Sequence, residues 1–191
     1  EPHPGFSILK EMLLNKPYFV ITSNIDEQFQ KAGFDRKNIF EIHGSIYNSQ
    51  CIYNAECETW DTEYPKLEKD SITASPPFPM CPECNSYCRP NIHLFEDDFF
   101  VPSIAADQQF RYMEWQDKIK RYRKNTIAIE IGAGTTISTL RRYSEEFAAN
   151  KFPLIRINLN DSETAKTNHI SVALGALDCL LQIKNSIDKK D

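Results

Sequence analysis

Residues Tyr18 to Asp26 read Tyr-Phe-Val-Ile-Thr-Ser-Asn-Ile-Asp, and this stretch decides the fold class. Its first part, Tyr18 to Ile21, is a short apolar run typical of a buried parallel strand. The polar residues Thr22 to Asp26 follow at the carboxyl end of that strand, where open parallel sheets bind their ligands. Ser, Asn and Asp are also ordinary helix caps, so the residues alone leave binding and capping both open.

The same alternation continues along the chain. Further apolar, β-branched runs predict strands at Ile39 to Ile42, Ile127 to Ile131 and Leu154 to Ile157. Amphipathic patterns predict helices between them, with Ser171 as the N-cap of the last, at Phe6 to Asn15, Glu27 to Ala32, Asp107 to Lys124, Thr139 to Ala149 and Val172 to Ile183. Strands that alternate with helices indicate a three-layer α/β fold.

His43 stands directly after the predicted strand Ile39 to Ile42 and is followed by Gly44 and Ser45. A histidine at the carboxyl end of a strand is well placed to act as a general base, because its imidazole titrates near neutral pH. A lone histidine is also commonly structural. The residues leave both interpretations open.

A glycine turn, Gly132-Ala133-Gly134, follows the predicted strand Ile127 to Ile131 in a chain with only 6 glycines. Glycines after a strand and before a helix let backbone N–H groups approach a phosphate or a ribose. The third glycine of the usual dinucleotide-binding motif is missing, and tight turns also require glycine for steric reasons. This turn is therefore a candidate for nucleotide binding, with a purely steric role of the glycines as the alternative.

Five of the 6 cysteines lie within 38 positions, between Cys51 and Cys88. Cys81 and Cys84 have the two-residue spacing that presents two thiolates to a tetrahedral zinc ion. Cys51 and Cys57 are the expected second pair, although their wider spacing leaves Cys88 as an alternative ligand. Buried free thiols are the competing interpretation. Residues 51–88 are predicted to form a small zinc-binding module inserted between 1–50 and 89–191, which form the main domain.

Charge and hydropathy restrict the partners. The chain has 22 Lys and Arg against 27 Asp and Glu, a net charge of −5 and a pI of about 5.5, which gives no general attraction to nucleic acid or anionic membranes. No run of 18 apolar residues is present. Clustered cysteines without an even disulfide framework or a signal peptide are typical of metal binding in the cytoplasm, which is the expected location.

Taken in order, these motifs resemble the sirtuin family. That family shows a strand ending in Thr-Gln-Asn-Ile-Asp, a His-Gly pair, cysteine pairs that hold zinc, an Arg-Pro stretch ending in Phe-Gly-Glu, a Gly-Thr-Ser turn and a strand ending in Asn. The matching stretches beside the cysteines are Thr22 to Asp26, His43 to Ser45, Arg89 to Phe95, Gly132 to Gly134 and Ile155 to Asn158. The resemblance covers nearly the whole chain.

The resemblance implies a Rossmann-like parallel sheet with helices on both faces, a structural zinc ion and NAD as co-substrate. His43 would be the general base on the NAD ribose, and Asn24 would hold the ribose and a water beside it. Ile25 and Asp26 would bind the nicotinamide amide. The remaining implied cofactor-binding residues are Thr22 and Ser23 at the first strand end and Gly132, Ala133, Gly134 and Asn158 on the adenosine side.

The implied activity is deacylation of an acylated lysine in a protein or peptide, with cleavage of the nicotinamide–ribose bond. ADP-ribosyl transfer or NAD hydrolysis by the same base is the alternative, followed by a non-catalytic module. Departures from the family pattern are Ser23 in place of Gln, Ala133-Gly134 in place of Thr-Ser, Glu96-Asp97 in place of Gly-Glu, and His93 among residues that are usually apolar. The family's first strand and Gly-Ala-Gly loop, which bind the pyrophosphate, are expected to precede Glu1.

Overall fold

The structure is a computed structural model that describes residues 1–62, 73, 75–122, 125–149, 151–164 and 168–189. The chain divides into two compact units. The first contains Glu1–Val20, Gln28–Asn38 and Tyr112–Asp191, and the second contains Ile21–Glu27 and Ile39–Arg111. Each unit is described by itself below.

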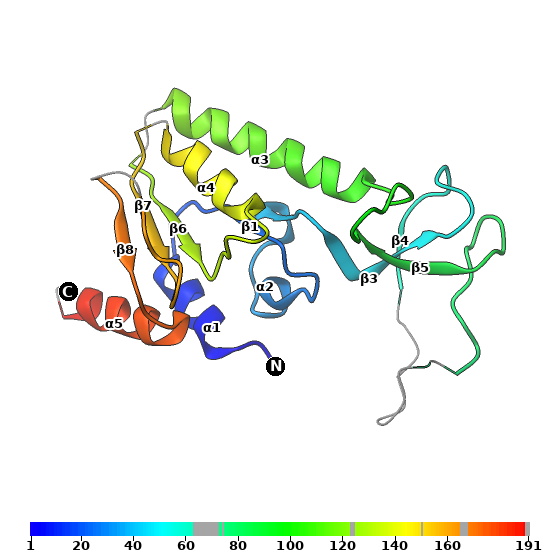
Figure 1. The fold of residues 1–191 in the computed structure, drawn as a ribbon, viewed down its shortest axis with the longest axis horizontal. Coiled ribbons are helices and arrows are strands. Elements are labelled where there is room, and N and C mark those ends of the chain that lie inside the picture. The colour runs from blue at the N-terminus through cyan, green and yellow to red at the C-terminus, as the bar shows by residue number, and fades with distance from the viewer. Residues whose placement is uncertain (63–72, 74, 123–124, 150, 165–167, 190–191) are drawn as a thin grey trace. The chain divides into compact units, whose positions relative to one another are not determined.

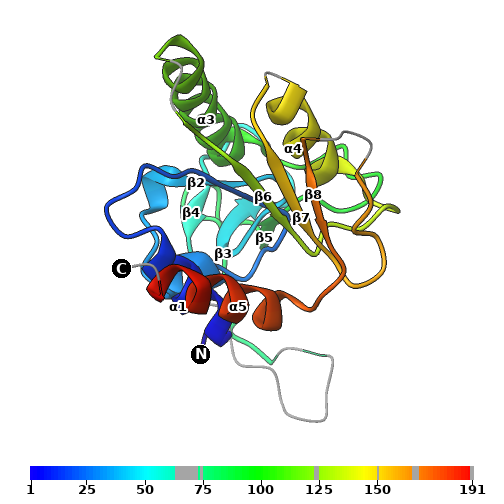
Figure 2. The ribbon, with the colours of Figure 1, turned by 90° about the vertical axis from the view of Figure 1, so that its left-hand side faces the viewer.

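A parallel sheet forms the centre of the first unit. It consists of β6 (Ala128–Ile131), β7 (Leu154–Ile157) and β8 (Ile170–Val172), which lie side by side in that order (Figure 2). Leu154 and Ile157 are each only 1% exposed, so β7 is the buried middle strand that its apolar sequence predicts. The predicted strands at 127–131 and 154–157 are confirmed.

The last predicted helix begins later than expected. Val172 and Ser171 belong to strand β8, where Ser171 pairs with Arg156 and Val172 with Ile157. The helix α5 runs over Ala176–Asp188, and its N-cap is Gly175 rather than Ser171. The prediction of a helix from Val172 was wrong, because pairing with β7 holds residues 170–172 extended. The apolar spacing of the helix continues back to Val172 in the sequence, so the spacing alone did not show where the strand ends and the helix begins.

Helices pack on this sheet and on each other. Helix α4 (Thr139–Ala149) packs against β6 and β7, and α1 (Pro4–Met12) packs against α5 (Figure 1). Phe147 of α4 stacks on Trp115 with ring centroids 6.2 Å apart. Trp115 belongs to α3 (Ser103–Arg121), which begins and ends earlier than the predicted 107–124, with Lys124 outside the described residues. The short elements α2 (Gln28–Lys31) and η1 (Arg36–Asn38) complete the unit.

A buried ion pair connects β6 to β7. Arg156 donates from Nε to Glu130 Oε1 at 2.6 Å, and both side chains are less than 5% exposed. The Arg156 Nη2 group also reaches Glu145 Oε1 of α4 at 2.8 Å, and the Ser144 hydroxyl donates to Glu130. Burial by itself would lower the pKa of Arg156, but hydrogen bonds to Glu130 and Glu145 outweigh it and raise the pKa. Arg156 therefore stays charged, and its contacts with Glu130 and Glu145 tie the sheet to α4.

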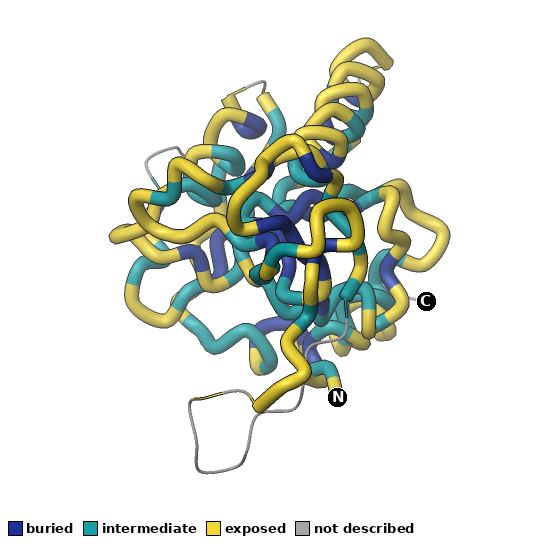
Figure 3. The backbone as a smooth tube through the Cα atoms, turned by 90° about the vertical axis from the view of Figure 1, so that its right-hand side faces the viewer, coloured by how far each residue is buried: buried dark blue, intermediate teal, exposed yellow. Residues whose placement is uncertain are grey.

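The second unit is built on an antiparallel sheet that the sequence did not predict. Strand β3 (Gly44–Cys51) lies between β4 (Trp60–Asp61) and β5 (Cys88–Ile92). Figure 3 colours the backbone by burial, with buried stretches in dark blue. Most of β3 is buried, yet it includes the polar residues Ser45, Ser49 and Gln50. Because these buried residues are polar, β3 lacks the apolar pattern by which a strand is recognised.

Hydrogen bonds satisfy the buried polar groups of this sheet. Asn91 Nδ2 donates to Gln50 Oε1 at 2.9 Å and to the Val101 carbonyl at 2.9 Å. The Val101 N–H donates to Gln50 Oε1 at 3.1 Å, and Gln50 Nε2 donates to the Phe99 carbonyl at 2.7 Å. This network fixes the chain that follows β5, since a buried amide left without partners would cost free energy.

Strands β1 (Val20–Thr22) and β2 (Ile39–Glu41) pair with each other, close to the predicted ranges 18–21 and 39–42. The predicted module 51–88 lies within the second unit, and residues 63–72 and 74 of it fall outside the described residues. Its separation as a domain stays a prediction. Within the described ranges, we find no helix with the length and apolar character needed to cross a membrane.

Gly44 allows β3 to begin directly beside β5. Its φ is +75°, and a Cβ added there would lie 2.0 Å from the Asn91 carbonyl oxygen. Gly33 has a similar φ of +83° but open space around it. We expect Gly44→Ala to lower the free energy of unfolding by roughly 2–5 kcal/mol, from backbone strain plus the clash, and Gly33→Ala by about 1–2 kcal/mol from strain alone. Chemical denaturation of both variants checks this, and equal losses would contradict the clash.

Candidate functional site

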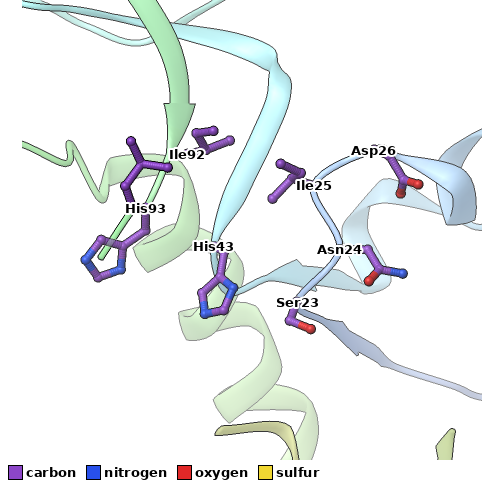
Figure 4. A pocket seen from close by; sticks show the side chains of 8 residues that line it. Ser23, Asn24, Ile25, Asp26, His43, Ile92 and His93 are labelled. Atoms are coloured by element: carbon purple, nitrogen blue, oxygen red, sulfur yellow. The ribbon is translucent and has the colours of Figure 1, made fainter. Parts of the chain in front are cut away.

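A cavity of about 380 Å³ opens in the second unit, next to the end of β1 and the turn between β2 and β3. Figure 4 shows His43 in the middle of the lining, with His93 on one side and Ser23 and Asn24 on the other. The lining residues are Ser23, Asn24, Ile25, Asp26, His43, Ile92, His93 and Leu94. The structure therefore brings the two predicted catalytic residues, His43 and Asn24, to one cavity, together with Ser23, Ile25 and Asp26.

The loop after β1 is held in place by β3 and by its own side chains. The Ile46 N–H donates to the Ile25 carbonyl at 3.0 Å, and the Ser45 hydroxyl donates to Glu27 Oε1 at 3.2 Å. Thr22 does not line the cavity: it is 6% exposed, and its Oγ1 accepts the Asn24 N–H at 3.1 Å. Thr22 thus shapes the turn that presents Asn24.

His43 occupies the turn between β2 and β3, and its carbonyl accepts the His93 N–H at 3.0 Å. The two imidazole rings lie 6.5 Å apart between centroids. Burial lowers the pKa of His43 and so does the charge of His93, while a hydrogen bond with the Ser23 backbone acts in the opposite direction. The net effect is a pKa below 6.5, so His43 is a neutral imidazole at pH 7 and can accept a proton.

The pKa of His43 leads to an expected pH profile. If neutral His43 is the base, nicotinamide release should be constant from neutral to mildly alkaline pH and decrease only as the pH falls through the lowered pKa. His93→Gln removes one charge that lowers this pKa, so the pKa of His43 should rise and activity should be lost at a higher pH than in the wild type. NMR titration of His43 and the pH dependence of the rate measure both. An unchanged pKa in His93→Gln would contradict the coupling.

The loop on the His93 side of the cavity is fixed by an ion pair that sequence analysis did not single out. Arg89 Nη2 donates to both carboxylate oxygens of Asp97, at 2.7 and 2.9 Å. Burial tends to raise the pKa of Asp97, but hydrogen bonds from Arg89 and from the Leu94 and Phe99 N–H groups lower it overall. Glu96-Asp97 stands where sirtuins have Gly-Glu, and the structure gives Asp97 an ion-pair partner in Arg89.

The glycine turn follows β6 in the first unit, and hydrogen bonds join it to the end of β7. The Gly132 N–H donates to the Ile157 carbonyl at 2.9 Å, and Asn158 Nδ2 donates to the Ala133 carbonyl at 3.0 Å. Gly132 has a φ of +69°, and a Cβ added to Gly132 or Gly134 would have no atom within 4 Å. The structure thus brings Gly132, Ala133, Gly134 and Asn158 together beside open space.

The helix predicted at Thr139 to Ala149 is confirmed as α4. Bends at Thr135 to Ile137 separate its N-terminus from Gly134. Any anion bound at the turn would rely on loop N–H groups rather than on a helix end.

Four cysteine side chains form the remaining predicted site. Among the described residues, Cys51, Cys57, Cys81 and Cys84 place their Sγ atoms within 4.8 Å of one another. Cys51 Sγ and Cys84 Sγ are 3.5 Å apart, close to the roughly 3.8 Å between two sulfurs bound tetrahedrally at about 2.3 Å to zinc. Cys88 is outside the group, and its Sγ donates to the Pro79 carbonyl at 3.2 Å. The donors therefore fit a zinc ion, and the geometry favours Cys57 over Cys88.

The thiols of this group influence one another strongly. Burial and hydrogen bonds with Cys81 and Cys84 raise the pKa of Cys57 to about 12. Hydrogen bonds with Ser86 and with Cys51 and Cys81 lower the pKa of Cys84 to about 6. Asn85, at a φ of 57°, forms the turn after Cys84, with its N–H donating to the Cys81 carbonyl at 2.9 Å. Such a turn positions both sulfurs of the pair on one side.

Curated relatives match parts of the chain. An NAD-dependent protein deacetylase from Clostridium perfringens is 32% identical over 97 residues, which are 51% of this chain and 34% of that protein. A protein ADP-ribosyltransferase from Staphylococcus aureus is 26% identical over 142 residues, 69% of this chain and 43% of that protein. The chain thus spans less than half the length of these two relatives.

Solved structures share the fold. A Sir2 homolog in complex with NAD superposes with a TM-score of 0.67 at 19% identity and covers 100% of this chain and 66% of its own. Sir2 bound to an acetylated peptide gives a TM-score of 0.66 at 20% identity, covering 97% and 70%. These likenesses confirm the predicted fold class, a Rossmann-like α/β sheet with a small cysteine-bearing segment.

The family model for the Sir2 family matches residues 1–118, well over half of the chain. This match includes the cavity around His43 and all four clustered cysteines. The predicted resemblance is confirmed, and the protein belongs to the Sir2 family, the sirtuins.

Proposed function

We propose that this chain carries the base and the nicotinamide-binding part of an NAD-dependent protein lysine deacylase. The observation that supports this most is the shared cavity of His43, Asn24 and Asp26, in which the imidazole is neutral at pH 7 and lies opposite amide and carboxylate groups. NAD is the co-substrate, an acylated lysine of a protein or peptide is the acceptor, and zinc has a structural role at the cysteines.

In the proposed reaction the acyl oxygen of the modified lysine bonds to the ribose carbon of NAD as the bond to nicotinamide breaks. Asp26 and Ile25 hold the nicotinamide amide, and Asn24 holds the ribose. His43 then takes the proton from a ribose hydroxyl, whose oxygen attacks the acyl carbon. Water adds to the same carbon, the bond to the lysine nitrogen breaks as the protonated amine leaves, and the acyl group remains on the ADP-ribose oxygen. The lowered pKa of His43 suits its task as the base, because an imidazole already carrying a proton could not accept another.

A second candidate is ADP-ribosyl transfer to a protein. Two observations favour it: His93 places a polar ring in the cavity beside Ile92 and Leu94, and the Staphylococcus aureus ADP-ribosyltransferase aligns over 69% of this chain. The same base and the same nicotinamide contacts would serve this reaction, with a different nucleophile at the ribose carbon.

Product analysis separates the two. The full-length protein is incubated with NAD and an acetyl-lysine peptide, and nicotinamide, peptide mass and protein-bound ADP-ribose are measured together. Deacylation predicts that nicotinamide and deacetylated peptide appear in equal amounts and only when the peptide is present. Protein-bound ADP-ribose without deacetylated peptide would support the second candidate, and no nicotinamide release under any condition would contradict both.

A further inference from the structure

Arg141 of α4 connects the two strand-end loops of the first unit. Its Nε donates to the Ala133 carbonyl at 3.1 Å, and its Nη2 donates to the Asp161 carbonyl. Ala133 belongs to the turn after β6, whereas Asp161 belongs to the loop after β7. One planar guanidinium therefore bonds to both loops at once through two separate nitrogen atoms held in a fixed fork, whereas a lysine carries all its donors on one nitrogen.

The contacts of Asn158 complete this connection. Asn158 Nδ2 donates to the same Ala133 carbonyl at 3.0 Å, so this oxygen accepts from Asn158 and from Arg141. Asn158 Oδ1 accepts the N–H groups of Asn160 and Asp161 at 3.0 and 3.1 Å. The Asn158 side chain is thus positioned by the Ala133 carbonyl and by the backbone of Asp161, and Arg141 bonds to both of these residues.

We propose that Arg141 is a positioning residue for the NAD site. It keeps the turn Gly132 to Gly134 and the loop Asn158 to Asp161 in the arrangement that receives the nucleotide. This inference rests on the proposed use of NAD as co-substrate, together with the place on the adenosine side of NAD that the sirtuin resemblance implies for Gly132, Ala133, Gly134 and Asn158. One backbone hydrogen bond, from the Gly132 N–H to the Ile157 carbonyl, joins the bases of the two loops. Farther along the loops, the contacts described above come from the side chains of Arg141 and Asn158, which therefore help to set how far apart the loops lie. Arg141 should therefore set the affinity for NAD and leave the chemistry at His43 unaffected.

Helix α4 provides a matched control for the test. Arg142 is the next residue, its side chain is 68% exposed, and it lies 4.0 Å from Glu146 in an exposed pair. Arg141→Met removes both loop contacts while keeping a long side chain. Arg141→Lys can replace one contact but not two. Arg142→Met makes the same change in side chain where neither loop is contacted.

The experiment measures NAD binding by calorimetry and nicotinamide release by the full-length protein, with thermal denaturation as a check on folding. In Arg141→Met we expect the Kd and the KM for NAD to rise about tenfold or more, because a hydrogen bond from a charged donor has this effect on an equilibrium. The kcat at saturating NAD should stay within about twofold of the wild type. Arg141→Lys should be intermediate, and Arg142→Met should match the wild type.

Wild-type affinity for NAD in Arg141→Met would overturn this role while leaving the proposed function intact. A fall in kcat with an unchanged KM would also overturn it. If Arg141→Met fails to fold, Arg141→Lys takes its place, and normal NAD binding by that folded variant counts against the proposal. Failure of the wild type to bind NAD would instead overturn the proposed function, and the role of Arg141 with it.

Discussion

Replacing His43 by alanine should reduce nicotinamide release at saturating NAD and acylated peptide by roughly 10²- to 10⁴-fold, the usual contribution of a general base. The fold should survive, because the contact of His43 with the segment after β5 is made by its carbonyl, which accepts the His93 N–H and which alanine retains. NAD binding should also be preserved, since the proposed contacts of His43 are made in the reaction rather than in binding.

Asn24→Ala should lower nicotinamide release in the same way. The Asn24 backbone N–H donates to Thr22 Oγ1, so loss of the side chain leaves the turn intact. His93→Gln, assayed at mildly alkaline pH where His43 is neutral in both proteins, is the matched control, since it changes the other imidazole of the same cavity. If His43→Ala and Asn24→Ala both release nicotinamide at nearly the wild-type rate, neither residue is catalytic and the proposed mechanism fails.

Loss of the metal should have the largest effect on stability. We expect one zinc ion per chain in the purified protein, bound by Cys51, Cys57, Cys81 and Cys84. Cys81→Ser should abolish zinc binding and unfold the surrounding segment, because Cys81 is 1% exposed and the buried residues around it are the cysteines themselves, with Trp60 packed against them. A zinc site closed by four thiolates contributes folding free energy directly, about 10–16 kcal/mol in small zinc-binding peptides.

Metal analysis and limited proteolysis measure these outcomes, before and after treatment with a chelator. Cys88→Ser is the control, because the Cys88 thiol lies outside the cluster and bonds to the Pro79 carbonyl. That variant should keep its zinc and its resistance to protease. A protein without zinc in which the cysteine segment still resists protease would contradict the prediction, and so would loss of zinc in Cys88→Ser.

Apolar strands could be predicted from the sequence, while polar ones could not. Leu154 and Ile157 belong to a continuous apolar run, which identifies a buried parallel strand. Strand β3 buries Ser49 and Gln50 at 1% exposure or less, and its stability depends on partners such as Asn91 that lie about 40 residues away. The order of apolar and polar residues within a short stretch gives no information on hydrogen bonds to distant residues, so the antiparallel sheet of β3, β4 and β5 was not predicted.

Part of the candidate site could likewise be predicted from the sequence, and part could not. His43 and Asn24 could be identified because polar residues directly after strands gather at one edge of a sheet. Arg141 could not, because its importance comes from the carbonyl groups of Ala133 and Asp161, and a carbonyl group has no signature in the sequence. The sequence favoured Cys57 as the fourth ligand but left Cys88 as an alternative, and the positions of the sulfur atoms distinguish the two.

The buried pair of Glu130 and Arg156 has a consequence for how this sequence can diverge. Loss of Arg156 alone would remove the ion-pair partner of the buried Glu130, and loss of Glu130 alone would leave the buried Arg156 with only the exposed Glu145 as an ion-pair partner. Breaking a buried pair typically costs about 3–5 kcal/mol. Replacement of both by apolar residues of similar volume is often neutral or stabilising. Since Glu130 and Arg156 face each other in register across β6 and β7, we expect descendants of this protein to keep both residues or to exchange both. Intermediates with a single change would rarely persist, so these two positions should evolve as one unit.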